Sequence, residues 1–312
     1  MRNILVTGGA GFIASEMAIR LAQDSENTVV VVDSLVTGRT SNLPLDAYDN
    51  LHFIRCDVNV YEDISGIFHS YNFDYVFHYA ALVGVLRTLE NPVKVLDDVT
   101  GIRNVLNLSK NSRVKRVLYS SSSEVYGEPV EIPQNEDTTP LNSKLPYAIV
   151  KNIGEASLRS YHQEFGLEFT IFRFFNTYGP KQSPDFVISK FIKAAMAGED
   201  ITVYGDGSQT RTFCHVDDNV DTCLKVFYED LHVNDVLNIG SDKELSIKEL
   251  AELIIKVTNS SSQVRHLPAL KEGDMRRRLP DNSKMMSILG HPLLPLEEGL
   301  KKVIAQPAFI LA

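Results

Sequence analysis

The sequence predicts an α/β protein built on a doubly wound parallel sheet, followed by a smaller mixed α/β region. Three observations carry this prediction. Short runs of β-branched and aromatic residues alternate with helical patterns through the first half of the chain. A glycine-rich turn directly follows the first of these runs, and from Gly179 onward proline and glycine interrupt the alternation. Strands and helices that alternate in this way are typical of a parallel sheet with helices on both faces.

The first strand is expected at residues 4–7 and the first helix at residues 15–22. The turn between them, Gly9-Ala10-Gly11-Phe12-Ile13-Ala14, fits the G-x-G-x-x-G/A pattern of dinucleotide-binding (Rossmann) folds. Its glycines let the backbone approach a pyrophosphate, and the following helix presents its N-terminal amides to that group. The sequence therefore predicts a dinucleotide site at this end of the sheet.

The second strand, residues 28–32, ends in Asp33, about 20 residues beyond the turn, as the pattern requires. A carboxylate there can accept hydrogen bonds from both ribose hydroxyls and would repel a 2′-phosphate. NAD is therefore expected rather than NADP. Arg39 leaves the NADP interpretation open, and the structural alternative is that Asp33 caps a loop.

Further strands are expected at residues 51–55, 75–81, 116–119 and 169–173. Asp57 follows the third strand at a place where it could meet an adenine amino group. Helices are predicted from Pro92 to Ser109 and from Tyr147 toward Phe165. Because the carboxyl ends of parallel strands meet at one edge, we expect His78 and the serines after the fifth strand to lie beside the dinucleotide.

Residues 179–312 are predicted to form a smaller, mainly substrate-binding region that follows a dinucleotide-binding domain at residues 1–178. Helices alternate there with short isolated strands, expected at residues 201–204 and 236–239. We expect this region to close over the edge of the sheet.

Composition argues against several classes of function. The chain has 312 residues, of which 44% are hydrophobic and 23% charged, as in ordinary soluble globular proteins. The net charge of −9 argues against a nucleic acid or an anionic membrane as partner. Three scattered cysteines without metal-ligand spacing predict reduced thiols and no metal site. No apolar run approaches membrane-spanning length and the first strand starts next to Met1, so a cytoplasmic location is expected.

Tyr147 and Lys151 lie four positions apart, on one face of the predicted helix. A nearby ammonium stabilises a phenolate and lowers the pKa of the tyrosine, and a positively charged nicotinamide would add to this effect. Tyr147 could then take a proton from a substrate hydroxyl while hydride leaves the same carbon, with Ser122 hydrogen-bonded to that oxygen. The structural alternative is an exposed helix with a half-buried tyrosine, because this spacing is common by chance.

Nearly the whole chain resembles the extended short-chain dehydrogenase/reductase family, the NAD-dependent sugar-nucleotide epimerases and dehydratases. The resemblance rests on ordered motifs: Thr7 to Ile13, Asp33 with Gly38-Arg39, Asp57-Val58, His78 to Ala81, Ser121 to Gly127, Pro146-Tyr147 with Lys151, Arg173 to Pro180, and Gly205 to Arg211. It implies that Tyr147, Lys151 and Ser122 form the catalytic core. It also implies that tightly bound NAD first oxidises C4 of a nucleoside diphosphate sugar.

The resemblance also implies binding roles. The residues implied to contact NAD are Gly8, Gly11, Phe12, Ile13, Asp33, Arg39, Asp57, Val58, Ala80, Ala81, Tyr147 and Lys151. Asn176 and Arg211 are implied to hold the diphosphate, which suits an amide donor and a bidentate guanidinium; for Arg211 the alternative is a surface ion pair. Val85 and Tyr204 are expected to shape the sugar and base pockets. For His78 the resemblance implies a structural and cofactor-contact role.

After the oxidation at C4, members of the family diverge, and two residues bear on this choice. Glu124 resembles the acid/base glutamate of the 4,6-dehydratases, which also lies in the decarboxylase site, and a carboxylate beside a C4 ketone could remove the C5 proton. Arg278 falls near the arginine that binds the substrate carboxylate in decarboxylases, but it could equally bind a diphosphate or belong to a solvated charge run. In contrast, Ser123 stands where the glucose dehydratases keep an aspartate, and residues 145–148 are similar to the epimerases.

We predict a nucleotide-sugar 4-epimerase. The alternatives are a 4,6-dehydratase, a UDP-glucuronate-type decarboxylase and a net C4 dehydrogenase. A non-catalytic nucleotide-sensing protein is an alternative from another class, and the intact Ser122, Tyr147 and Lys151 argue against it. A homodimer is expected from the resemblance alone.

Overall fold

The computed structural model describes residues 1–268 and 277–306 of the chain. Its centre is a sheet of seven strands in the order β11-β6-β5-β4-β1-β2-β3, and every neighbouring pair is parallel. This confirms the predicted doubly wound fold. The strands are β1 Arg2–Thr7, β2 Asn27–Asp33, β3 Leu51–Arg55, β4 Tyr75–His78, β5 Arg116–Ser122, β6 Glu168–Phe174 and β11 Asp235–Ile239.

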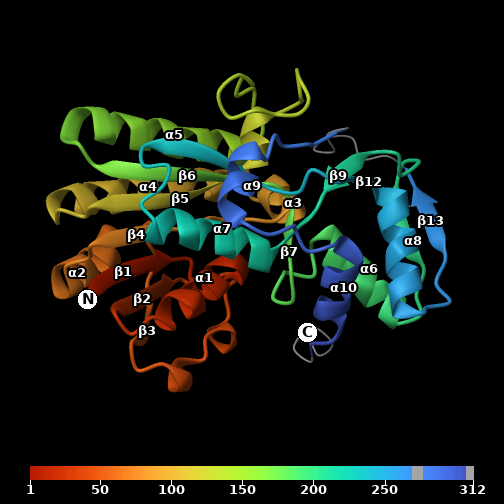
Figure 1. The fold of residues 1–312 in the computed structure, drawn as a ribbon, viewed down its shortest axis with the longest axis horizontal. Helices are drawn as coiled ribbons and strands as arrows, with labels where there is room; N and C mark the ends of the chain where they lie inside the picture. The colour runs from red at the N-terminus through yellow and green to blue at the C-terminus, as the bar shows by residue number, and fades with distance from the viewer. Residues whose placement is uncertain (269–276, 307–312) are drawn as a thin grey trace.

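Helices cover both faces of this sheet (Figure 1). Alternate residues of a strand point to opposite faces, so β1 contributes Ile4 to one core and Leu5 to the other. On the Ile4 face lie α1 Phe12–Ala22, α7 Val216–Tyr228 and α9 Ser283–Leu289. On the Leu5 face lie α2 Tyr61–Tyr71, α4 Pro92–Asn111 and α5 Pro146–Phe165. The site therefore lies on a scaffold that is packed on both sides.

The prediction of an isolated strand at residues 236–239 was wrong. These residues belong to β11, which pairs in parallel with β6 and forms one edge of the main sheet. The short apolar run is almost fully buried, and such a run indicates a strand without indicating which sheet it joins. The boundary between residues 178 and 179 stays a prediction, but α7 and β11, which follow it, both pack in the sheet domain.

The rest of the C-terminal half is a smaller mixed α/β region with its own apolar core. Its helices are α6 Val187–Met196, α8 Ile247–Thr258 and α10 Leu296–Ile304. Its strands form small pairs: β8 Ile201–Tyr204 with β13 Val264–Leu267, β9 Thr210–Thr212 with β12 Glu244–Ser246, and β7 Thr177–Tyr178 with β10 Cys214–His215. Short elements complete the described fold: α3 Val85–Glu90 and the 3-10 helices η1 Thr40–Asn42, η2 Leu45–Ala47 and η3 Ser123–Tyr126. Within the described ranges, no helix combines the length and apolar character needed to cross a membrane.

Candidate active site

The turn between β1 and α1 approaches the end of β4 very closely. Gly8 has φ +67°, and a Cβ at this position would lie 2.7 Å from the Ala80 backbone, so a side chain cannot be accommodated. Thr7 Oγ1 accepts hydrogen bonds from the N–H of Tyr79 at 3.1 Å and of Ala80 at 3.2 Å. Gly11 precedes α1 and brings no side chain to its N-terminus. The free approach to the first amides of α1, at Phe12 and Ile13, fits a pyrophosphate.

Asp33 lies at the carboxyl end of β2 and is almost fully buried. Its carboxylate accepts hydrogen bonds from Ala10 N at 3.0 Å and Leu35 N at 2.7 Å. A Cβ on Gly38 would lie 2.7 Å from Asp33 Oδ2, so this loop closes directly over the carboxylate. Burial raises the pKa of Asp33, against the two backbone hydrogen bonds. The carboxylate therefore stabilises the loop and also lies where the ribose of NAD is expected.

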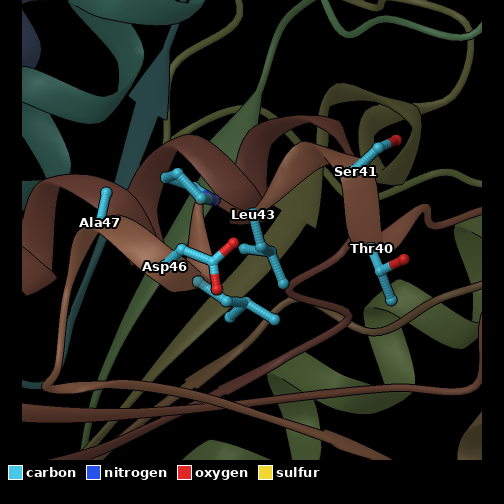
Figure 2. Close-up of a pocket in the computed structure, with 7 residues that line it drawn as sticks. Thr40, Ser41, Leu43, Asp46 and Ala47 are labelled. Atoms are coloured by element: carbon cyan, nitrogen blue, oxygen red, sulfur yellow. The ribbon is translucent and has the colours of Figure 1, made fainter.

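The loop after Arg39 forms an open hollow, shown in Figure 2. The hollow is lined by Thr40, Ser41, Leu43, Pro44, Leu45, Asp46 and Ala47, none of which is cationic. The side chain of Arg39 itself is exposed, and its backbone N–H donates to Ala10 O at 2.9 Å. A 2′-phosphate beside Asp33 would therefore meet this carboxylate as well as the Arg39 cation. The arrangement favours NAD.

The remaining predicted cofactor residues lie after β3 and β4: Asp57, Val58, Ala80 and Ala81.

Lys151 is deeply buried beneath the end of β5. Its Nζ donates to Ser120 O at 2.6 Å and lies 5.8 Å from the centre of the Tyr147 ring. Burial lowers the pKa of Lys151 to about 8, and the carboxylates of Asp98 and Glu155 act in the opposite direction. Lys151 therefore keeps its positive charge at neutral pH. It lies beside Tyr147, as the four-residue spacing on the helix predicted.

Tyr147 is half-buried in the first turn of α5. Burial raises the pKa of its phenol well above the ordinary value, while the neighbouring Ser122 hydroxyl and the Arg278 charge act to lower it. The expectation that Lys151 would bring this pKa down is thus wrong for the protein alone, because desolvation exceeds the effect of nearby charges. Tyr147 is a neutral phenol in the resting site, and the positive charge of a bound nicotinamide has to assist its ionisation.

Ser122 ends β5 and caps η3. Its Oγ accepts a hydrogen bond from Glu124 N at 3.2 Å. The hydroxyl has one hydrogen, which this contact does not use, so Ser122 can still donate to a substrate oxygen. The hydroxyl is thereby held in place without losing its capacity as a donor.

Glu124 and Arg278 form an ion pair with an N–O distance of 2.6 Å. The two side chains are 15% and 8% exposed, so the pair is largely buried. The Glu124 charge raises the pKa of Tyr147 and the Arg278 charge lowers it, which places both charges at the tyrosine. Within the described part of the chain, Glu124 Oε2 and Arg278 Nε have no hydrogen-bond partner. The pair therefore has polar atoms left for further contacts.

In the described part of the charge run at residues 276–278, the Arg277 side chain is exposed and the Arg278 side chain is buried, and each pairs with a carboxylate. Arg277 Nε donates to Glu244 Oε1 at 2.7 Å, and Arg278 pairs with Glu124. Arg276 lies outside the described residues. The two described arginines therefore face different carboxylates, and only Arg278 lies beside Tyr147.

The residues expected to hold the diphosphate lie in loops and short strands beyond the sheet. Asn176 follows β6, has φ +36°, and its buried Nδ2 has no hydrogen-bond partner among the residues described. A strained backbone and an unsatisfied donor are typical of a ligand-binding residue. Arg211 in β9 is 9% exposed, and its Nη1 donates to Thr210 O at 2.8 Å. Tyr204 ends β8 beneath the Lys190 ammonium, whereas the Val85 side chain lies outside what the structure describes.

His78 is held neutral by its surroundings. Thr7 Oγ1, which already accepts two N–H donors, donates to His78 Nδ1 at 2.8 Å. Burial and the Lys151 charge lower the pKa of His78 to about 3. A neutral imidazole bound to Thr7 suits a structural role at the end of β4.

Sequence reasoning missed the buried charges that surround this core. Glu155 and Arg173 form a buried bidentate pair, with Nη2–Oε2 at 2.7 Å and Nε–Oε1 at 3.0 Å. Asp98 of α4 accepts a hydrogen bond from Leu82 N at 2.7 Å, and burial raises its pKa. The signal for Glu155 was present, because it lies four residues after Lys151 on the same helix face. No local pattern marked Asp98.

The match to a family model covers most of the sheet. Residues 4–240 match the model described as the NAD dependent epimerase/dehydratase family. The zebrafish (Danio rerio) protein named UDP-glucuronic acid decarboxylase 1 is 36% identical over 97% of this chain and 72% of its own length. A Bacillus cytotoxicus protein named UDP-N-acetyl-alpha-D-glucosaminuronate decarboxylase is also 36% identical, over 97% of both chains.

One solved structure with a similar fold is that of an enzyme named as an epimerase, not as a decarboxylase. It is the UDP-glucose 4-epimerase of Thermotoga maritima, determined with UDP-glucose. It is 33% identical, superposes with a TM-score of 0.90, and covers 97% of each chain. Chains similar to this one thus include both decarboxylases and an epimerase, all of them named for sugar nucleotides.

Proposed function

The chain belongs to the NAD-dependent epimerase/dehydratase family, and from this premise we propose that it decarboxylates a nucleoside diphosphate-linked uronic acid. The reaction would begin with oxidation at C4 of the sugar. It would continue with loss of the carboxylate attached to C5 as carbon dioxide. This proposal replaces 4-epimerisation, which the sequence favoured, with one of the alternatives that the sequence left open.

The residues around Tyr147 supply the acid/base chemistry of this proposal. Ser122 would donate a hydrogen bond to the C4 oxygen, and Tyr147, once ionised, would take the proton of the C4 hydroxyl. NAD, when bound, supplies the acceptor for the C4 hydride. The resulting ketone is β to the sugar carboxylate, so the electrons of the breaking C–C bond can move into the C4 carbonyl. Ser122 and Tyr147 would then stabilise the negative charge on that oxygen until C5 is protonated. Return of the hydride to C4 and of the Tyr147 proton to its oxygen would restore the C4 hydroxyl and the oxidised cofactor.

The ion pair between Glu124 and Arg278 is the observation that carries the proposal. A largely buried guanidinium costs free energy unless an anion pairs with it, and here Glu124 fills that role in the absence of substrate. A neutral hexose carries no charge that could pair with Arg278, and the resemblance places the diphosphate at Asn176 and Arg211. A uronate carboxylate gives Arg278 a second anionic partner beside Tyr147. Glu124, released from Arg278, would then take up a proton from water and deliver it to C5.

A 4-epimerase is the second candidate. The stretch Leu145-Pro146-Tyr147-Ala148 favours it, together with the likeness to the Thermotoga maritima epimerase. In that reaction the Glu124–Arg278 pair would remain closed and would only position Tyr147. The two candidates therefore differ in whether the pair contacts the substrate.

Mass spectrometry of sugar nucleotides incubated with the NAD-loaded protein separates the candidates. The panel contains UDP-glucuronate, UDP-N-acetylglucosaminuronate, UDP-glucose, and dTDP-, GDP- and CDP-linked sugars. We expect a product that has lost carbon dioxide from a uronate, and no conversion of UDP-glucose. A product of unchanged mass and new retention time would instead establish epimerisation, and a loss of water would establish dehydration.

We also propose a homodimer formed through α4 and α5, which pack against each other on one face of the sheet (Figure 1). These helices expose Val93, Leu96, Ile149 and Ile153. Ile153→Lys should therefore convert a dimer into a monomer in light scattering after size-exclusion chromatography. The matched control is Met286→Lys, since Met286 lies on α9 on the other face and is equally exposed, at 37%. A monomeric unmodified protein would contradict the proposal.

A further inference from the structure

We infer that Asn238 is a positioning residue that fixes Arg278 against Glu124. The inference rests on the proposed function in one respect, which is that Arg278 binds the carboxylate of the substrate. It is carried by a set of buried polar contacts that we call the Asn238 clamp, which consists of Asn238, Tyr126, Gln134 and Asp281. The clamp joins three parts of the chain that are distant in sequence.

Asn238 lies on β11 and is fully buried. Its backbone N–H, its side-chain oxygen and its side-chain nitrogen all make hydrogen bonds. Its backbone N–H donates to Glu136 Oε1 at 2.7 Å, and its Oδ1 accepts from the Tyr126 hydroxyl at 2.7 Å. Its Nδ2 donates to Gln134 O at 2.8 Å and to Asp281 O at 3.1 Å. One side chain thus holds two backbone segments and a tyrosine.

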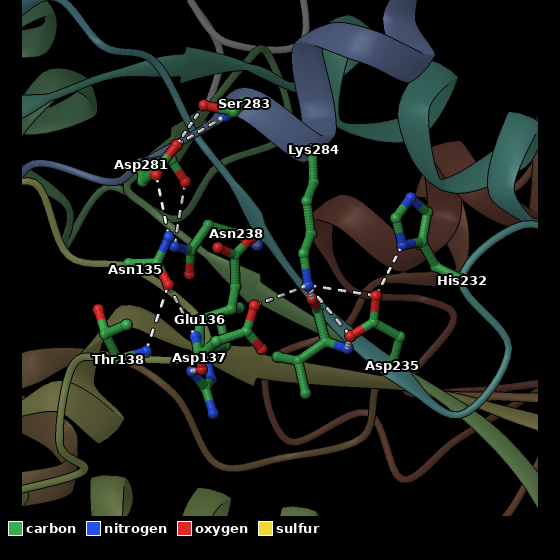
Figure 3. A network of polar contacts seen from close by, with 12 residues as sticks. Asn135, Glu136, Asp137, Thr138, His232, Asp235, Asn238, Asp281, Ser283 and Lys284 are labelled. Carbon is green, nitrogen blue, oxygen red and sulfur yellow. Dashed lines mark hydrogen bonds and ion pairs between the residues drawn. The ribbon is translucent and has the colours of Figure 1, made fainter.

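The segment that Asn238 holds is the one that carries Arg278. Gln134 N donates to Leu279 O at 2.7 Å, and Asp281 N donates back to Gln134 O at 2.8 Å. Figure 3 shows Asn135 facing Asp281, where Asn135 Nδ2 donates to Asp281 Oδ2 at 3.0 Å, with Asn238 beside them. Arg278 immediately precedes this bridge. Its backbone position is therefore set next to a bridge that Asn238 contacts at Gln134 O and Asp281 O.

The clamp also reaches the other side of the active site. Arg173 Nη1 donates to the Tyr126 hydroxyl at 2.8 Å, and Arg173 pairs with Glu155 of α5. Glu155 in turn accepts a hydrogen bond from Ser121 Oγ at 2.6 Å, directly before Ser122. Tyr126 belongs to η3, the short helix that carries Glu124. One buried network therefore connects the segments of Arg278, Glu124, Ser122 and Lys151.

Loss of the Asn238 amide would take from Asp281 O the donor that Asn238 supplies, and would leave Gln134 O with the Asp281 N–H. The 279–281 segment can relieve this only by moving to find other donors, and Arg278 would move with it. A buried ion pair is sensitive to such movement because its strength depends on close geometry. Disruption of the clamp should therefore weaken the Arg278–Glu124 interaction without touching either residue.

The test is a double-mutant cycle on unfolding free energy. The coupling between Arg278→Gln and Glu124→Gln is measured by denaturant unfolding, once with Asn238 and once with Asn238→Leu. We expect the coupling to fall by about half or more in the leucine background. An unchanged coupling would overturn the inference. If Asn238→Leu does not fold, Asn238→Ser takes its place, since it also removes the amide that donates to Gln134 O and Asp281 O, and the same two outcomes apply.

Asn27→Leu is the matched control. Asn27 is also fully buried, and its Nδ2 donates to Leu21 O and to the Tyr228 hydroxyl. It lies at the opposite end of the strands, at the start of β2. We expect Asn27→Leu to lower overall stability as well, but to leave the Arg278–Glu124 coupling unchanged. Loss of coupling in this control would show that general destabilisation is the cause.

A binding measurement separates this inference from the proposed function. In NAD-loaded Tyr147→Phe protein, in which turnover should be at least about 100-fold slower, calorimetry compares the binding of UDP-glucuronate with that of UDP-glucose. We expect a preference for UDP-glucuronate that Asn238→Leu reduces about tenfold, with little change for UDP-glucose. If the Tyr147→Phe protein that retains Asn238 bound UDP-glucuronate no more tightly than UDP-glucose, the uronate proposal would be contradicted. The coupling cycle would still decide the role of Asn238.

Discussion

Tyr147→Phe is expected to reduce turnover by about 10²- to 10⁴-fold while leaving NAD bound. The substitution removes only the phenol oxygen, which is the group proposed to take the proton from the C4 hydroxyl. The ring remains, so its packing beside Lys151 and the end of β5 is preserved. Turnover is followed with whichever sugar nucleotide the unmodified protein converts, and bound NAD is measured after denaturation of the purified protein.

Tyr161→Phe is the matched control for this experiment. Tyr161 lies on the same helix, is also half-buried, and donates one hydrogen bond, to Asn107 Oδ1 at 2.7 Å. Loss of its hydroxyl should leave turnover unchanged. Undiminished turnover in Tyr147→Phe would exclude the proposed acid/base mechanism. Loss of NAD together with turnover would instead make Tyr147 a residue of cofactor binding.

Local patterns were sufficient to predict the cofactor end of the fold. The turn at Gly8 to Ala14 and the carboxylate of Asp33 belong to one continuous β-α-β unit, whose spacing is fixed by the length of a helix. The relation between Tyr147 and Lys151 is equally local, because two residues four positions apart on a helix lie on the same face. Such features can be predicted from sequence since the chain has little freedom between their parts.

Features that depend on distant segments could not be predicted in the same way. The sequence indicated that 236–239 is a strand, but its place beside β6 depends on the path of the long segment between them. Glu124 and Arg278 were considered separately, and no spacing rule connects residues so far apart. The pKa of Tyr147 was predicted with the wrong sign, because the spacing to Lys151 gives a charge effect and says nothing about burial.

The Glu124–Arg278 pair gives the second large effect. Arg278→Gln is expected to lower uronate turnover by about 100-fold or more, because the substrate carboxylate loses a charge-assisted partner. It should also cost about 3 kcal/mol or more of unfolding free energy, since it leaves the Glu124 carboxylate largely buried and unpaired. The double variant Arg278→Gln/Glu124→Gln should recover much of this stability, but not the turnover. Denaturant unfolding and product mass spectrometry measure the two effects independently.

Arg277→Gln provides the comparison within the same segment. Its guanidinium is 49% exposed and pairs with Glu244, so its loss should cost less than about 1 kcal/mol and leave turnover unchanged. Comparison of the two variants thus distinguishes the effect of losing a buried charge beside Tyr147 from the effect of losing a surface ion pair. If Arg278→Gln lost stability but kept full uronate turnover, the pair would be structural and Arg278 would not bind the substrate carboxylate. Stability that recovers in the double variant without turnover requires at least one of the two residues to act in the reaction, because a purely structural pair would restore both together.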